Sequence, residues 1–215
     1  MTPAAIAGLP ALAALVAVPF TASGAQGAFQ ADLAGLIACV GCAAFLVRPR
    51  RADAAALVAA ALLLGLVHLV AGGPASGATS QLLLAFAVAL AASGLAALGR
   101  AVGAPALTAG AAAAAVLWVA MSGLVWADDL AESQPRERRF AFRQAVVHLD
   151  AATACAFDAA EYDRFHDDRL YRRVPLAASL VRAPSAGSTA LAWIVLGVLA
   201  WGAAMGLRFG RPRSS

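Results

Sequence analysis

The sequence predicts an all-α, polytopic membrane protein with about six transmembrane helices and an extracytoplasmic helical segment between helices five and six. Composition is the first reason: 62% of the residues are hydrophobic and 13% are charged, with a mean hydropathy of +0.78. Soluble domains are usually about 45–50% apolar and about 25% charged. The second reason is that ten of the twelve acidic residues and nine of the sixteen arginines lie between Asp128 and Arg182. Lipid is therefore expected to solvate most of the remaining chain.

Six apolar stretches are long enough to cross a bilayer, which takes about 20 residues of helix with a range near 17–25. They cover residues 4–20, 29–47, 54–71, 81–98, 107–126 and 191–207. Short links that contain Gly or Pro separate the first five, so consecutive helices are expected to be antiparallel neighbours. Small residues, such as those at 91–94, are dense in the stretches and allow close backbone approach. We therefore expect a tight bundle, or an interface with other membrane subunits.

The first stretch has an alternative interpretation as a cleaved signal peptide. Its apolar run has a suitable length, and Ser23, Gly24 and Ala25 resemble a small-residue cleavage site. It lacks the positively charged start that signal peptides carry. An uncleaved transmembrane helix is therefore favoured, and the topology of the remaining chain is the same in either case.

Arginines in the short loops set the expected orientation, because cytoplasmic loops carry the excess of basic residues. The short loops at 21–28 and 72–80, on the opposite side, carry none. The arginines on the basic side are Arg48, Arg50, Arg51, Arg100, Arg208, Arg211 and Arg213. We expect both termini in the cytoplasm, residues 127–190 outside it, and the chain in the inner (cytoplasmic) membrane of a bacterium. Trp126 and Trp193 fall where an outer aromatic belt is expected.

The polar segment divides the chain into a five-helix region at 1–126, the segment at 127–190, and a last helix with a short tail at 191–215. Residues 136–165 contain neither Gly nor Pro, so we expect helix between about Pro135 and Asp168, as one long helix or two shorter ones. About 60 residues cannot bury a large core alone. The segment is therefore expected to pack on the bundle or to dock other membrane or periplasmic subunits. The docking candidates are Phe140, Phe142, Phe157 and Phe165.

Residue types that bind metals follow the expected outer helix. On a continuous helix His148, Cys155 and His166 share one face, and imidazole, thiolate and carboxylate suit Zn or Cu. The two histidines would lie about 27 Å apart, at about 1.5 Å per residue, so they share one ion only if the helix breaks. A compact alternative combines His166 with Asp163 and Asp167. The competing interpretation is an amphipathic face that rests on the bundle or on a partner. No cofactor can be identified from these patterns.

His68 is the one ionisable side chain well inside a predicted transmembrane helix, near its outer end. Ionisable residues within the membrane are candidates for function by default. Asp32 and Gln81 are expected at the same outer level as candidate hydrogen-bond partners. The three residues predict a polar vestibule for a substrate, a proton or a quinol. The structural alternative is a neutral histidine that a loop carbonyl satisfies.

Catalysis within the membrane has less support. Cys39 and Cys42 form a Cys-x-x-Cys pattern, but near the middle of a membrane a thiolate is unfavourable and the thiols act as small apolar groups. The serine-protease motif Gly-x-Ser-Gly is incomplete, because Ala91 stands where its first Gly should precede Ser93. An enzyme is therefore the less favoured class.

These patterns favour a non-catalytic integral membrane subunit or accessory protein of a larger cell-envelope complex, whether respiratory, photosynthetic or secretory. It would dock partners through its extracytoplasmic helices. The alternative is a small transporter or metal-handling membrane protein with an outer-facing polar vestibule. Beyond the lipid bilayer, other protein subunits are the expected partners. Nucleic acid is not, despite the net charge of +4, because most arginines sit at segment ends.

Overall fold

The structure is a computed structural model that describes residues 2–17, 25–46, 51–121, 130, 133, 135–147, 149–151, 154–155 and 185–209. Every regular element in this part of the chain is an α-helix, which confirms the predicted all-α class. The helices are α1 (Pro3–Ala17), α2 (Ala25–Ala44), α3 (Arg51–Val70), α4 (Ala75–Ala101), α5 (Ala106–Met121), α7 (Arg136–Val147) and α10 (Ala186–Phe209).

Three helices are long and apolar enough to cross a membrane by length and composition. They are α3, α4 and the Ala186–Arg208 part of α10, with 20, 27 and 23 residues. At about 1.5 Å per residue, about 20 residues cross a hydrocarbon core of about 30 Å. Helices α1 and α5 and the Ala28–Ala44 part of α2 are apolar but shorter. The described helices therefore provide three candidate membrane spans, and the other three predicted spans coincide with shorter apolar helices.

The outward faces of the long helices are apolar. On α10, Leu191 and Leu199 are 61% and 65% exposed, and on α3, Leu62 and Leu66 are 57% and 56% exposed. Contiguous exposed apolar surface marks contact with lipid or with another protein. These faces fit the membrane association that the composition indicates.

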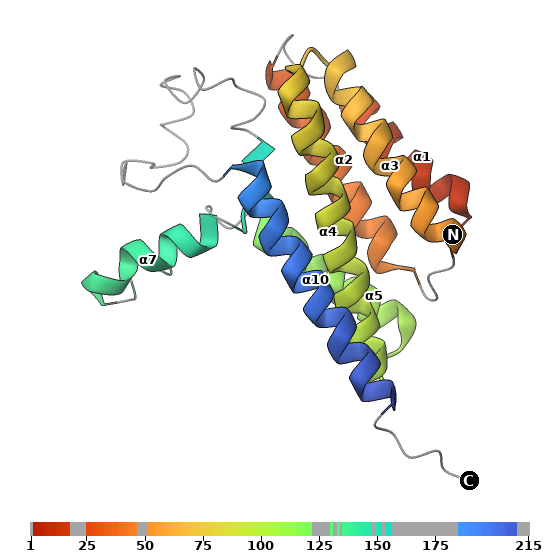
Figure 1. The fold of residues 1–215 in the computed structure, drawn as a ribbon, viewed down its shortest axis with the longest axis vertical. Coiled ribbons are helices and arrows are strands. Elements are labelled where there is room, and N and C mark those ends of the chain that lie inside the picture. Colours follow the sequence, from red (N-terminus) through yellow and green to blue (C-terminus); the bar gives the residue numbers. More distant parts are fainter. Residues whose placement is uncertain are drawn as a thin grey trace.

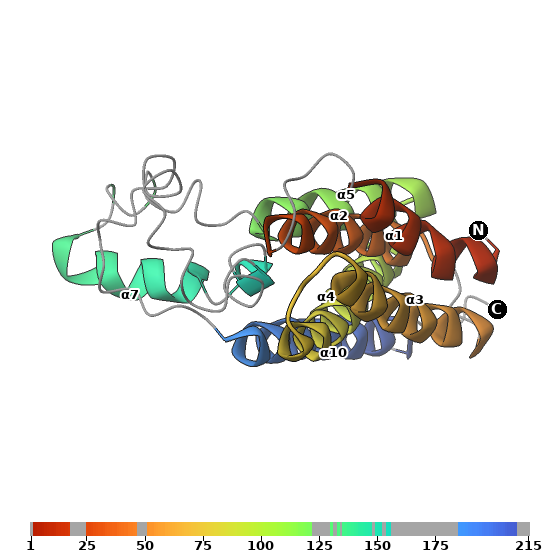
Figure 2. The ribbon, with the colours of Figure 1, turned by 90° about the horizontal axis from the view of Figure 1, so that it is seen from above.

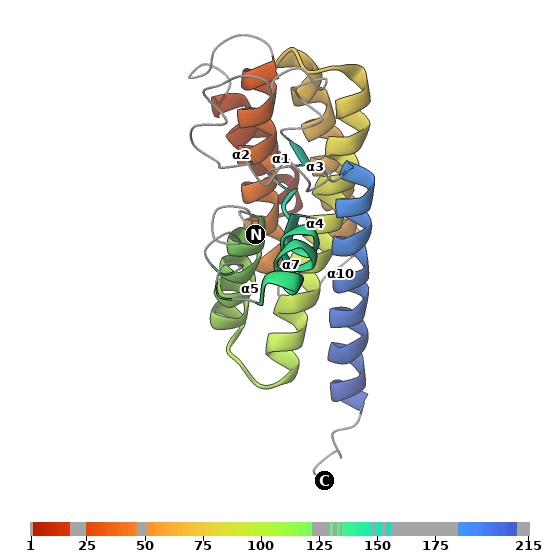
Figure 3. The ribbon, with the colours of Figure 1, turned by 90° about the vertical axis from the view of Figure 1, so that its left-hand side faces the viewer.

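Helix α4 is the centre of the bundle. It packs against α2, α3, α5 and α10, while α1 packs against α2 and α3. Figures 1 and 2 show α4 between its neighbours, and Figure 3 shows α10 running alongside α4. Alanine, glycine and serine make up most of the buried face of α4. Because these side chains are small, several neighbouring backbones can approach one helix closely.

The contact between α4 and α10 depends on glycine. A Cβ atom added at Gly197 would lie 2.9 Å from the backbone C of Leu90, and one added at Gly94 would lie 2.8 Å from the carbonyl O of Gly197. Beside this crossing, the indole N–H of Trp201 donates to Oγ of Ser93 at 3.2 Å. The Ser93 hydroxyl donates in turn to the carbonyl O of Leu90 at 3.0 Å. The serine weighed above as a nucleophile therefore helps to hold α10 on α4.

All six bundle helices begin earlier than their apolar stretches, and the difference is largest for α4 and α10. Helix α4 begins at Ala75 instead of Gln81, and α10 begins at Ala186 instead of Leu191. Hydropathy detects only the apolar part of a helix, whereas the first turn of a helix need not be apolar. At the start of α10, Oγ of Ser185 accepts the backbone N–H of Ser188 at 3.1 Å, as an N-cap residue does.

Helix α7 stands apart from the bundle (Figures 1 and 2). It begins directly after Pro135, in agreement with the predicted start, and ends at Val147. Leu149 then lies in a turn and Asp150 lies outside any helix. A helical stretch begins again at Ala151, and the carbonyl of the preceding Asp150 accepts the N–H of Ala154 at 3.1 Å. Of the two alternatives for this region, the interruption excludes one continuous helix. Residues 156–168 lie outside the described part of the chain.

Trp193 corrects one expectation from the sequence. Its side chain is 1% exposed and packs into the core cluster of the bundle. A tryptophan of an aromatic belt would instead face the lipid headgroups. The prediction was wrong for Trp193 because hydropathy gives depth along a helix but not the face a residue occupies. Trp126 lies outside the described residues.

Substitution of Gly197 by Ala should weaken the packing of α10 on α4, because the new methyl group would meet backbone atoms of α4. Overpacking of this kind typically costs about 1–3 kcal/mol. Gly202→Ala is the matched control on the same helix, since nothing lies within 4 Å of a Cβ added there. Thermal unfolding in detergent, followed by circular dichroism, should show a lower midpoint for Gly197→Ala alone. Equal midpoints for the two variants would contradict the close contact.

Candidate functional site

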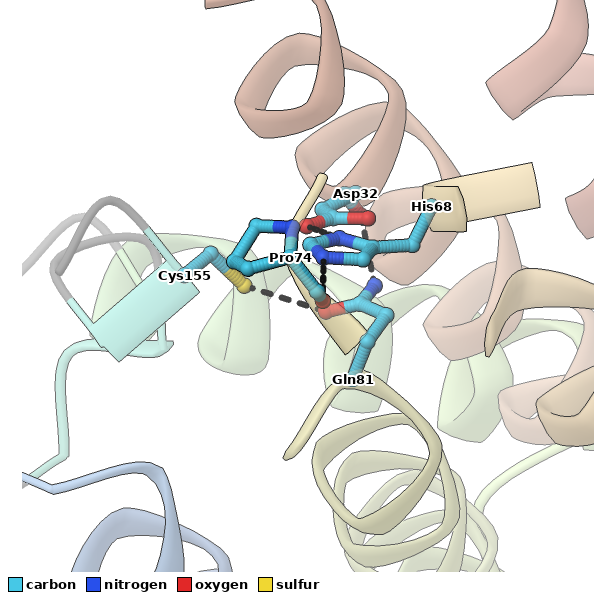
Figure 4. A network of polar contacts seen from close by, with 5 residues as sticks. All are labelled: Asp32, His68, Pro74, Gln81 and Cys155. Carbon is cyan, nitrogen blue, oxygen red and sulfur yellow. Dashed lines mark hydrogen bonds and ion pairs between the residues drawn. The ribbon is translucent and has the colours of Figure 1, made fainter. Parts of the chain in front are cut away.

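A buried polar cluster lies at the end of the bundle where α3 ends and α4 begins (Figure 4). Asp32 comes from α2, His68 from the last turn of α3 and Gln81 from α4. Their exposed fractions are 3%, 0% and 2%. The structure thus brings together the three residues that the sequence grouped as a vestibule. Cys155, from the short helical stretch after α7, joins them.

The turn after α3 positions the imidazole of His68. Gly72 has a φ of +88°, in the left-handed region that favours glycine. The N–H of Gly73 donates to the carbonyl O of His68 at 2.9 Å and closes the last turn of the helix. Pro74 follows and directs its carbonyl O to the His68 ring. The Gly-Gly-Pro sequence therefore folds the backbone over the side chain that precedes it.

Both ring nitrogens of His68 have acceptors. Nδ1 lies 2.7 Å from Oδ2 of Asp32, and Nε2 lies 3.1 Å from the carbonyl O of Pro74. The histidine therefore has both the carboxylate and the loop carbonyl that the sequence offered as alternative partners. Because the pair is buried, its electrostatic interaction is stronger than it would be in water.

Gln81 connects this pair to the segment after α7. Its side-chain amide donates to the backbone carbonyl of Asp32 at 3.1 Å, and its Oε1 accepts the thiol S–H of Cys155 at 3.3 Å. Cys155 is 1% exposed, and the neighbouring Ala151 and Ala154 are fully buried in the core cluster of the bundle. One chain of polar contacts therefore joins α2, α3, α4 and the helical stretch that contains Cys155.

The chemistry that this arrangement supports is proton binding. An imidazole and a carboxylate in hydrogen-bond contact can hold a proton between them. The Cys155 thiol donates to an amide oxygen, which favours its protonated form, whereas a nucleophile or a metal ligand needs the thiolate. The cluster is accordingly a candidate site for a proton and not for thiol chemistry.

The predicted metal ligands cannot be placed as a set. His148, Asp163, His166 and Asp167 lie outside the described residues, so only Cys155 has a described position. Within the described residues, no three His, Cys, Asp or Glu side chains come together as ligands for one ion. The prediction that His148 and Cys155 share one face assumes a continuous helix. The chain leaves the helix at Leu149 and Asp150, so this assumption does not hold.

The predicted docking residues are described in part. Phe142 lies on α7 and is half-buried, and on the same face Val146 is buried. Phe140 lies in α7, but its side chain is not among those described, and Phe157 and Phe165 fall outside the described residues. Ala141, on the other face of α7, is exposed.

The two cysteines of the Cys-x-x-Cys pattern pack inside the bundle. Cys39 and Cys42 are both free and buried. The thiol of Cys39 donates to the carbonyl O of Ala85 on α4 at 3.7 Å. This contact joins α2 to α4 within the bundle.

Sequence reasoning missed two members of the cluster. Pro74 lies in one of the short links whose Gly and Pro residues predict only a break between helices, although two glycines before a proline permit the sharp turn found here. Cys155 was grouped with metal ligands, and no local pattern connects it to Gln81, which lies 74 positions earlier in the chain.

Comparison with protein-family models, with curated proteins and with solved structures finds no match to this chain.

Gly73→Ala should displace the imidazole of His68. A Cβ at Gly73 would lie 2.5 Å from Cε1 and 2.6 Å from Cδ2 of the ring, which is closer than such contacts permit. The variant should therefore unfold at a lower temperature than the wild type. In a His68→Ala background the methyl group has room, so the same change should cost much less. A double-mutant cycle measures this coupling, and additive effects of the two changes would contradict the contact.

Proposed function

We propose that this chain is a six-span integral protein of the bacterial inner membrane that serves as a non-catalytic subunit or accessory protein of a larger cell-envelope complex. In this proposal residues 1–126 form a five-helix membrane region, and residues 127–190 form an extracytoplasmic segment. The last helix and its tail occupy 191–215. The extracytoplasmic helices dock the partner subunits.

Charge at the helix ends supports this orientation. Arg51 lies at the start of α3, whereas Arg100 and Arg208 lie in the last turns of α4 and α10. Helices α3 and α4 are consecutive and antiparallel, and α10 runs parallel to α4, so these ends lie on the same side of the bundle (Figure 1). The polar cluster lies at the opposite end, where α3 ends. The positive-inside rule then assigns the arginines to the cytoplasm and the cluster to the outer side.

The observation that carries the docking proposal is the division of the outer segment into an anchored part and a projecting part. Ala151, Ala154 and Cys155 are buried against the bundle. Helix α7, a few residues earlier, projects away from it (Figures 1 and 2). An anchored arm of this kind presents a helix beside the bundle, where another subunit can bind it. Helix α7 carries four arginines and one glutamate, so charge complementarity favours an acidic partner surface.

The alternative is a small transporter or metal-handling membrane protein with an outer-facing vestibule. The observation in its favour is the buried contact between Asp32 and His68, because ionisable groups within a membrane commonly mark pathways for ions or substrates. Native mass spectrometry with metal analysis separates the two. A stoichiometric complex with other subunits supports docking, whereas a monodisperse homo-oligomer with bound metal supports the alternative.

The topology can be tested by cysteine labelling in intact cells. In a variant without the native cysteines, a cysteine at Glu132 should react with a membrane-impermeant reagent added from outside. A cysteine at Arg211 should react only after the membrane is permeabilised, because the arginine-bearing loops are expected in the cytoplasm. The reverse pattern of labelling would reject the proposed orientation.

Phe142→Glu should release the partner subunits and leave membrane insertion unchanged. Phe142 is only partly covered within this chain, and a charge there opposes the burial of its remaining surface against another protein. Ala141→Glu is the matched control, because it adds the same charge on the exposed face of the same helix. The measurement is the mass of the complex purified from native membranes.

His148→Ala and His166→Ala should leave assembly intact, and loss of function in those variants with the complex still assembled would favour the metal-handling alternative.

A further inference from the structure

The hydrogen bonds around His68 fix the number of protons on its ring. A carbonyl oxygen can only accept a hydrogen bond, so Nε2, at 3.1 Å from the carbonyl O of Pro74, carries a hydrogen. A neutral imidazole has one N–H, which this bond uses. Nδ1 then has a lone pair directed at Oδ2 of Asp32, unless a further proton is present.

The distance between Nδ1 and Oδ2 requires that further proton. A lone pair and an ionised carboxylate oxygen would repel each other at 2.7 Å, whereas a shared proton gives a hydrogen bond of ordinary charge-assisted length. The proton resides either on the imidazole, as an imidazolium beside a carboxylate, or on Asp32, as a carboxylic acid that donates to Nδ1. In both arrangements the pair has no net charge.

We propose that the Asp32–His68 pair is a binding site for a single exchangeable proton, and that the closed geometry of the cluster is the proton-bound state. This inference goes beyond partner docking and does not depend on it, since it needs only the contacts of the cluster.

Burial makes the proton-free state unfavourable in this geometry. His68 is 0% and Asp32 is 3% exposed, so loss of the proton would leave a net negative charge on the pair, out of contact with water. The two side chains must then separate, or the Gly72–Pro74 turn must move, before the charge can be solvated. Proton release and opening of the cluster are therefore linked, and the closed form is favoured at low pH and lost as pH rises.

Other charged groups near the cluster are few among the described helices that surround it. On α2 the remaining titratable groups are Cys39 and Cys42, and on α3 Arg51 and Asp53 lie in the first turn, at the far end of the helix. The one charged residue of α4 is Arg100, in its last turn. The stretch after α7 contributes Cys155, which faces Gln81, and the buried Asp150.

Asp32→Asn provides a precise test because an asparagine amide donates a hydrogen bond without a titratable proton. Asn at position 32 can donate to Nδ1 while Nε2–H still donates to Pro74, so it reproduces the closed hydrogen-bond pattern with a neutral imidazole. Wild type and variant should therefore share a geometry at low pH and differ only in whether the site can lose its proton.

The measurement is nitrogen NMR of ¹⁵N-histidine-labelled protein in liposomes. The chain has three histidines, so His148→Gln and His166→Gln leave His68 as the only signal. In the wild type, Nε2 should be protonated at low pH, and the signals should change reversibly as pH rises. The protonated-to-deprotonated ratio should fall by about tenfold per pH unit, as for one proton. In Asp32→Asn the spectrum should remain that of a neutral imidazole with Nε2–H throughout.

Two results would overturn the proposal. An unprotonated Nε2 in the wild type at low pH would mean that the donor to Pro74 is absent, and this result needs no variant. Identical spectra for wild type and Asp32→Asn at every pH would mean that Asp32 and His68 share no exchangeable proton. Neither result bears on whether partners bind α7, so failure here is distinguishable from failure of the docking proposal.

Discussion

Close backbone contact along α4 is the constraint on which the rest of the bundle depends. Where lipid surrounds apolar helices, it supplies no hydrophobic drive between them, so packing and hydrogen bonds hold such helices together. The glycine crossing of α4 and α10 and the Trp201–Ser93 hydrogen bond provide both. Larger apolar side chains such as Leu191 and Leu199 are correspondingly turned outward. The buried face of α4, by contrast, consists mostly of small residues.

The polar cluster depends on that packing. Because α2 and α3 both pack against α4, Asp32 and His68 meet at one level, and Gln81 lies beside them. Contacts between small apolar residues are permissive about exact register. A buried carboxylate–imidazole contact allows only one register, because shifting one helix along another would leave buried polar groups without hydrogen-bond partners. The cluster therefore fixes the register of helices whose other contacts would tolerate sliding.

Much of this arrangement could be predicted from the sequence. The all-α class follows from hydropathy, and the grouping of His68, Asp32 and Gln81 follows from their equivalent depths along three helices. Depth does not specify direction, which is why the buried position of Trp193 was missed. Nor does local sequence reveal a contact such as Cys155 with Gln81, which forms between distant segments only after the bundle has assembled. The predicted helix starts lay too late in the sequence. At α10, Ser185 and its neighbours stabilise a first turn without being apolar.

The order of elements along the chain also matters for biosynthesis. Translation proceeds from the N-terminus, so α1 to α5 leave the ribosome before Cys155, and the acceptor on Gln81 can be in place when that cysteine emerges. Helix α10 is synthesised last and packs chiefly on α4. A nascent chain that has not yet released α10 can therefore already contain the complete polar cluster. Packing of the final helix then buries the remaining face of α4 and covers its small-residue surface.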